Sequence, residues 1–83
     1  MTSRVFYKSS VARDLKKIAP MDKRRILQQI EEVLGSDPRR GEALRGEFGG
    51  LFKLRVGEYR VVYALADREI LVLRIRHRGK AYD

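Results

Sequence analysis

Residues 70–78 begin with four aliphatic side chains and then carry an arginine at every second position, and this pattern constrains the fold more than any other feature of the sequence. Successive side chains of a β-strand point to opposite faces, so the pattern predicts a strand with one aliphatic and one cationic face. A sheet that presents guanidinium groups on one surface is suited to bind a polyanion such as RNA or DNA. The predicted aliphatic face carries Leu71, Leu73 and Ile75, and the predicted cationic face carries Arg74, Arg76 and Arg78.

Two further alternating segments precede this strand. Residues 52–56 alternate apolar and basic side chains, and a second alternation runs over residues 59–65. Gly57-Glu58 between them suits a tight turn, and residues 66–69 supply the next turn. These segments therefore predict a three-stranded antiparallel meander at the C-terminal end.

The N-terminal half has a different periodicity. Residues 4–7 are β-branched and aromatic, which predicts a first strand, and Ser9 and Ser10 are candidate N-caps of a helix. The helix is predicted to begin near Val11, because apolar side chains then recur at helical spacing until Ala19-Pro20 interrupts them.

A second helix is expected to begin with Pro20 in its first turn and to end at Gly35, a natural C-terminal cap. The connection between the helices is short, so an antiparallel helix hairpin is predicted. Residues 36–50 contain Pro38 and several glycines, which favours irregular structure there.

The order of these elements predicts an α+β fold, with the helix hairpin packed on one face of the sheet. Apolar side chains of the three C-terminal strands would form the packed face, including Phe52, Leu54, Val56, Val61 and Tyr63. The opposite face would concentrate like charge, which costs stability unless an anion or an acidic partner relieves it. This cationic face comprises Lys53, Arg55, Arg60, Arg74, Arg76 and Arg78.

Composition narrows the classes of function. The 83 residues leave room for one domain, spanning residues 1–83, and the formal net charge of +8 favours nucleic acid or an acidic protein as partner. Thirteen of the nineteen basic residues are arginines, which pair phosphate bidentately. The sequence has no cysteine and no long apolar run, so we expect an intracellular, cytoplasmic protein that does not enter a membrane.

With these residues in place, the chain resembles the RelE/ParE superfamily of toxins from toxin–antitoxin operons. The resemblance rests on the order of elements, on Leu44-Arg45-Gly46 ahead of the hairpin, on the motif Gly-x-Tyr-Arg-Val-Val-Tyr over residues 57–63, and on His-Arg-x-x-x-Tyr over residues 77–82. The superfamily contains two activities on one fold, because RelE-like members cut messenger RNA in the ribosomal decoding site and ParE-like members poison DNA gyrase.

The resemblance to RelE-like members implies a metal-independent endoribonuclease that depends on the ribosome, inhibits translation and needs no cofactor. It places the catalytic residues at Lys53, Arg55, Arg60, Arg78 and Tyr82. Further RNA contacts are expected from Arg45, Arg74, Arg76 and Lys80. The chain departs from the pattern at Arg55, where a second lysine is usual, and it stops one residue after Tyr82, where many relatives continue into a helix.

RNA cleavage without a metal requires a base for the 2′-hydroxyl, an acid for the leaving oxygen and cations that stabilise the transition state. Arg60 and Arg78 are expected to supply the positive charge, and Tyr82 and Lys53 are the candidate acid and base. His77 is a further candidate, but strand parity places it on the packed side, which favours a structural role.

The resemblance also implies partners. We expect a RelB-like antitoxin, the ribosome and messenger RNA, with operator DNA bound only through the antitoxin complex. Two alternatives remain open from the sequence: a non-nuclease toxin that binds DNA gyrase, and a non-catalytic nucleic-acid-binding module.

Overall fold

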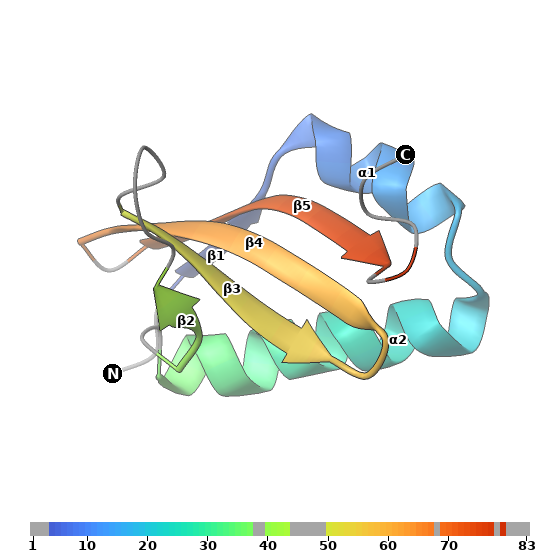
Figure 1. Ribbon diagram of the computed structural model, residues 1–83. Helices are drawn as coiled ribbons and strands as arrows, with labels where there is room; N and C mark the ends of the chain where they lie inside the picture. The colour runs from blue at the N-terminus through green and yellow to red at the C-terminus, as the bar shows by residue number, and fades with distance from the viewer. Residues whose placement is uncertain (1–3, 38–39, 44–49, 68, 78, 80–83) are drawn as a thin grey trace.

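The computed structural model describes residues 4–37, 40–43, 50–67, 69–77 and 79. These residues form a five-stranded sheet in the order β1-β5-β4-β3-β2, together with helices α1 and α2 (Figure 1). The strands are β1 (Arg4–Tyr7), β2 (Glu42–Ala43), β3 (Leu51–Val56), β4 (Tyr59–Ala66) and β5 (Glu69–His77). The helices are α1 (Ser9–Lys16) and α2 (Pro20–Gln29), and α2 continues into the π-helical turn η1 (Ile30–Leu34).

The predicted α+β architecture is confirmed. Strands β3, β4 and β5 form the antiparallel meander, and β1 lies parallel to β5 at one edge. The short strand β2 pairs with β3 at the other edge, inside a segment predicted to be irregular. Its two residues, Glu42 and Ala43, are too few to leave a periodic signal in the sequence.

The start of α1 differs from the prediction. Lys8 is the N-cap residue, and Ser9 and Ser10 both lie in the first helical turn. The Lys8 N–H donates to the Val72 carbonyl at 2.9 Å, so Lys8 still continues the pairing of β1 with β5. The Ser10 hydroxyl is thereby free of a capping role and donates to the Leu73 carbonyl at 2.7 Å.

Pro20 begins α2 as predicted, but the expected cap at Gly35 was wrong. Gly35 has φ −63° and ψ −32°, a right-handed helical conformation rather than the left-handed one of a glycine cap. The Asp37 N–H donates to the Val33 carbonyl at 2.8 Å, so helical hydrogen bonding continues past Gly35.

A β-bulge interrupts β5. Val62 on β4 lies opposite Arg74, but its neighbour Tyr63 lies opposite Val72, so Leu73 is the extra residue on β5. A bulge of this kind places two residues of one strand against one residue of its partner and reverses the alternation of faces beyond it. Strand parity on β5 therefore changes at Leu73.

Because of the bulge, the side chains of β5 that pack against the core differ from those predicted. Ile75 is buried as expected, but Leu71 is 40% exposed and Leu73 is only partly buried. Ile70 and Val72 are fully buried in their place. The simple alternation holds only for the basic half of the strand, beyond the bulge.

Both helices contribute to one hydrophobic core against the inner face of the sheet. Tyr63 is the largest fully buried side chain, and Phe52 and Leu54 pack at the margin of the core. The buried set is Val11, Ile18, Ile26, Ile30, Leu34, Val56, Val61, Tyr63, Ile70, Val72 and Ile75. The basic side chains of the meander lie on the outer face of the sheet, which also carries the exposed Leu71.

Candidate nucleic-acid interface

Three arginines lie in one row across the outer face of the sheet. Arg55 on β3 lies opposite Arg60 on β4, and Arg60 lies opposite Arg76 on β5. Side chains directly opposite each other on antiparallel strands share a face, with Cβ atoms about 4.5–5.5 Å apart. These three residues, the arginine row, bring three permanent positive charges together on the strands of the meander.

A second row lies beside the arginine row and is less uniformly charged. Lys53 lies opposite Val62, and Val62 lies opposite Arg74. Lys53 Nζ is 3.7 Å from a carboxylate oxygen of Glu42 on β2, with the Glu42 side chain 76% exposed. An ion pair this open to solvent is weak, so Lys53 can exchange Glu42 for another anion at little cost.

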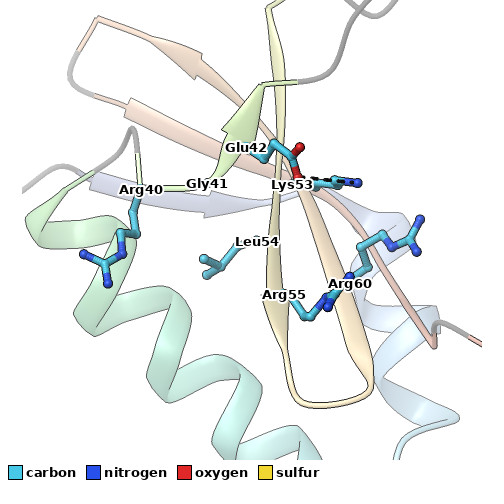
Figure 2. A pocket seen from close by; sticks show the side chains of 7 residues that line it. All are labelled: Arg40, Gly41, Glu42, Lys53, Leu54, Arg55 and Arg60. Carbon is cyan, nitrogen blue, oxygen red and sulfur yellow. Dashed lines mark ion pairs between the residues drawn. The ribbon is translucent and has the colours of Figure 1, made fainter.

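A hollow of about 440 Å³ lies where β2 meets β3. Figure 2 shows Arg55 and Arg60 on one side of β3 and Arg40 on the other, with the Lys53–Glu42 pair near the top of the view. Four cations and one carboxylate line the hollow, so its net charge is positive. The lining residues are Arg40, Gly41, Glu42, Lys53, Leu54, Arg55 and Arg60.

Gly41 ties this hollow to the hydrophobic core. Its N–H donates to the Tyr63 hydroxyl at 3.0 Å, and the Tyr63 ring stacks on Phe52 with centroids 5.5 Å apart. A Cβ atom at Gly41 would clash with the Tyr63 hydroxyl and lie 2.7 Å from the Lys53 carbonyl oxygen. Burial raises the pKa of Tyr63, only partly offset by the Gly41 hydrogen bond, so the hydroxyl stays protonated.

Side chains of α1 cover the edge of β5 beyond the end of β1. The Ser10 hydroxyl donates to the Leu73 carbonyl, and Asp14 Oδ2 accepts the Ile75 N–H at 2.9 Å. Ser10 and Asp14 are four residues apart, so they share one face of the helix. Side chains of the helix thus form the hydrogen bonds to backbone groups of β5 that a neighbouring strand would otherwise form.

Asp14 also holds Arg74 by a bidentate ion pair. Arg74 Nε lies 3.0 Å from Oδ2 and Arg74 Nη2 lies 3.1 Å from Oδ1. Burial acts to raise the pKa of Asp14, but the bonds from Arg74 and the Ile75 N–H, with the charges of Arg74 and Arg76, outweigh it and lower the pKa. Arg74 is therefore oriented by the fold, whereas the sequence predicted it only as an RNA contact.

His77 lies on the helix side of the sheet, the side that strand parity predicted. It is opposite Tyr59, and the two rings meet edge to face with centroids 5.1 Å apart. The Gly79 N–H donates to His77 Nδ1 at 3.0 Å. Ring and backbone contacts thus hold the imidazole at the end of β5.

The structure brings together three of the five predicted catalytic residues, Lys53, Arg55 and Arg60. The other two, Arg78 and Tyr82, lie outside the described residues, as do the predicted RNA contacts Arg45 and Lys80. The cross-strand register adds Arg76, which the sequence analysis assigned to RNA binding rather than to the catalytic group. No sequence signal could have placed Arg76 opposite Arg60, because the meander without the bulge would set Ile75 there and the bulge at Leu73 shifts the pairing by one residue.

Within the part of the chain that the structure describes, no three His, Asp or Glu side chains converge as a metal site would require. No helix among these residues is long and apolar enough to cross a membrane.

This fold has close counterparts among known proteins. Residues 5–82 match the family described as the ParE toxin of the parDE type II toxin–antitoxin system. The chain therefore belongs to this family of type II toxin–antitoxin toxins, within the RelE/ParE superfamily.

The individual relatives are RelE-like proteins. Toxin RelG of Mycobacterium tuberculosis is 35% identical over 94% of this chain and 93% of its own length. The toxin–antitoxin complex RelBE2 of the same organism matches with 31% identity and a TM-score of 0.89, covering 94% of this chain and 100% of that chain. An archaeal RelE–RelB complex from Pyrococcus horikoshii matches with 29% identity and a TM-score of 0.74, covering 98% of this chain and 100% of that chain.

Proposed function

We propose that this toxin is a ribosome-dependent endoribonuclease that cuts messenger RNA in the decoding site and thereby stops translation. The observation that carries the proposal is the arginine row, Arg55, Arg60 and Arg76, with Lys53 one row away on the same face. An aligned cationic row of this kind can bind a polyanion, and it can also stabilise the charge that develops on a phosphate during cleavage. A phosphoryl-transfer enzyme gains from cations held in fixed positions around the reacting phosphate, which supports the proposal.

In the proposed reaction the 2′-hydroxyl of a bound nucleotide attacks the adjacent phosphorus, and the 5′-oxygen of the next nucleotide leaves. Negative charge builds up on the non-bridging oxygens of the phosphate during this step. Arg60 and Arg76 would stabilise that charge as preorganised donors, and Arg55 would hold the phosphate from the neighbouring strand.

A base must remove the 2′-hydroxyl proton and an acid must protonate the leaving 5′-oxygen. Lys53 and Tyr82 are the proposed acid–base pair, and Arg78 would add a further positive charge. The exposed pair between Lys53 and Glu42 supports a position for Lys53 next to the substrate, because an entering phosphate can displace the carboxylate.

We also propose that a RelB-like antitoxin neutralises the toxin. RelBE2 and the archaeal RelE–RelB structure, to which this chain is similar, are toxin–antitoxin complexes. An acidic segment that covers the arginine row would relieve the repulsion between its charges and block RNA at the same time. Operator DNA would then be bound only through the antitoxin.

The alternative is a toxin that binds DNA gyrase and cuts no RNA. It is favoured by one observation, that the matching family is described as ParE toxin. The two candidates predict different targets, so a pair of parallel assays separates them.

Purified toxin is added to a cell-free translation reaction and, separately, to gyrase with relaxed plasmid. The endoribonuclease proposal predicts that protein synthesis stops, that primer extension maps new message ends within the codon covered by the ribosome, and that supercoiling proceeds. Intact message together with inhibited supercoiling would replace the proposal with its alternative.

A further inference from the structure

A second hollow lies on the opposite side of the arginine row from the first. It measures about 380 Å³ and lies between the C-terminal part of α1 and the end of β5. Arg76 belongs both to the arginine row and to the wall of this hollow. The lining residues are Asp14, Lys17, Ile18, Tyr59, Arg74, Ile75, Arg76 and His77.

The charge of the second hollow is positive. Lys17, Arg74 and Arg76 contribute three cations, against the single carboxylate of Asp14. That carboxylate is only 11% exposed and already accepts bonds from Arg74 and from the Ile75 N–H. Its charge is therefore largely compensated by its own partners, while Lys17 and Arg76 still attract an anion.

Arg74 is preorganised at this site. The bidentate pair with Asp14 fixes two of its N–H groups, so the guanidinium does not have to lose rotational freedom when an anion arrives. The Arg74 side chain remains 43% exposed, so its outer edge can meet a ligand.

We propose that the second hollow is a subsite for a backbone phosphate of single-stranded RNA that flanks the nucleotide to be cut. The proposal rests on the proposed function, since it extends the RNA proposed for the arginine row to the adjoining edge of the sheet, where α1 meets β5. Strands β3 and β5 are two strand spacings apart, about 10 Å. An RNA strand that follows the arginine row from the first hollow therefore arrives at Lys17 and Arg76.

The test uses purified full-length toxin and a fluorescent single-stranded RNA whose 2′-hydroxyls are methylated, so that it cannot be cleaved. Anisotropy gives the Kd over a series of salt concentrations for wild type, Lys17→Gln and Lys16→Gln. Lys16 is the matched control, because it is an exposed lysine of α1 that does not line the hollow. Thermal melts check that the variants are folded.

Each phosphate contact to single-stranded RNA contributes about −0.7 to the slope of log K against log salt concentration. Over the tenfold range from 1 M to 0.1 M salt, one such contact therefore tightens the Kd roughly fivefold. Lys17→Gln should therefore make the slope shallower by about 0.7, that is, less negative, and weaken binding roughly fivefold. Lys16→Gln should change neither quantity. Equal slopes and affinities for the two variants would overturn the subsite.

Message cleavage on programmed ribosomes by the wild-type toxin is measured in parallel. No cleavage, together with a shallower slope for Lys17→Gln, would reject the proposed function and retain the RNA subsite. If Lys17→Gln weakens binding of the antitoxin but leaves the RNA slope unchanged, the hollow is a protein contact and the proposal is wrong.

Discussion

Asp14 and Arg74 form a two-point ion pair, with Nε–Oδ2 and Nη2–Oδ1 distances of 3.0 and 3.1 Å, that joins α1 to β5 beside the arginine row. The same carboxylate accepts the Ile75 N–H, so one side chain fixes the position of the helix and of the strand that carries Arg76. The negative charge of Asp14 at the margin of the cationic face thus holds Arg74 and the backbone of β5 in position.

Asp14→Ala should lower the free energy of unfolding by about 1–3 kcal/mol, because the Ile75 N–H loses its acceptor and the Arg74 guanidinium loses its partner. Urea unfolding followed by circular dichroism measures this change. Glu58→Ala, an exposed carboxylate on the β3–β4 turn, is the control and should change stability by less than about 0.5 kcal/mol. Equal losses in the two variants would contradict the role given to Asp14.

The pKa of Asp14 is lowered in the folded protein, so its contribution to stability has a defined pH dependence. The contribution is complete above the unfolded-state pKa of about 3.9 and is lost as the pH falls through the lower, folded pKa. Urea midpoints measured between pH 6 and strongly acidic pH should therefore fall less steeply for Asp14→Asn than for wild type. Parallel curves would show that Asp14 is not the group responsible.

Gly41→Ala should destabilise the protein by about 1–3 kcal/mol, because the added methyl overlaps the Tyr63 hydroxyl and crowds the Lys53 carbonyl. Gly35→Ala is the control, and it should change the stability in the opposite direction. Gly35 is helical and a Cβ there meets nothing within 4 Å, so alanine should stabilise by about 0.4–1 kcal/mol. Thermal melts of both variants check the prediction, and a neutral Gly41→Ala would mean that the wall of the first hollow can move.

Arg60→Ala and Arg76→Ala should each reduce the single-turnover rate of message cleavage by roughly 10²–10³-fold, the usual effect of removing a donor to a developing charge. Arg24→Ala, on the exposed surface of α2, should cleave at the wild-type rate. Thermal melts separate this loss from misfolding. A wild-type rate for Arg76→Ala would return this residue to the group of peripheral RNA contacts.

Periodicity was sufficient to predict the order of every helix and strand except the short β2, and the faces of β3 and β4. The pairing of β3 with β4 has no bulge, so strand parity placed Lys53, Arg55 and Arg60 on one face correctly. The bulge at Leu73 could not be predicted, because an extra residue in a strand leaves no mark in a run of aliphatic side chains. That bulge is why Leu71 is exposed and Val72 is buried.

The candidate site was predictable to the extent that it depends on strand parity. The row formed by Arg60 and Arg76 depends on register between strands, which a single sequence does not specify before the turns are placed. The ion pair of Asp14 with Arg74 joins residues sixty positions apart, and no local pattern links them. Serine at positions 9 and 10 was misassigned because the sequence does not reveal that β1 continues its pairing through Lys8.

The most direct test of the central claim is single-turnover cleavage of a defined message on programmed ribosomes, compared with the same RNA free in solution. We expect a cut within the codon in the decoding site, far slower cleavage of free RNA, and loss of the cut in Arg60→Ala. Intact message on the ribosome, with a folded and antitoxin-free toxin present in excess, would contradict it.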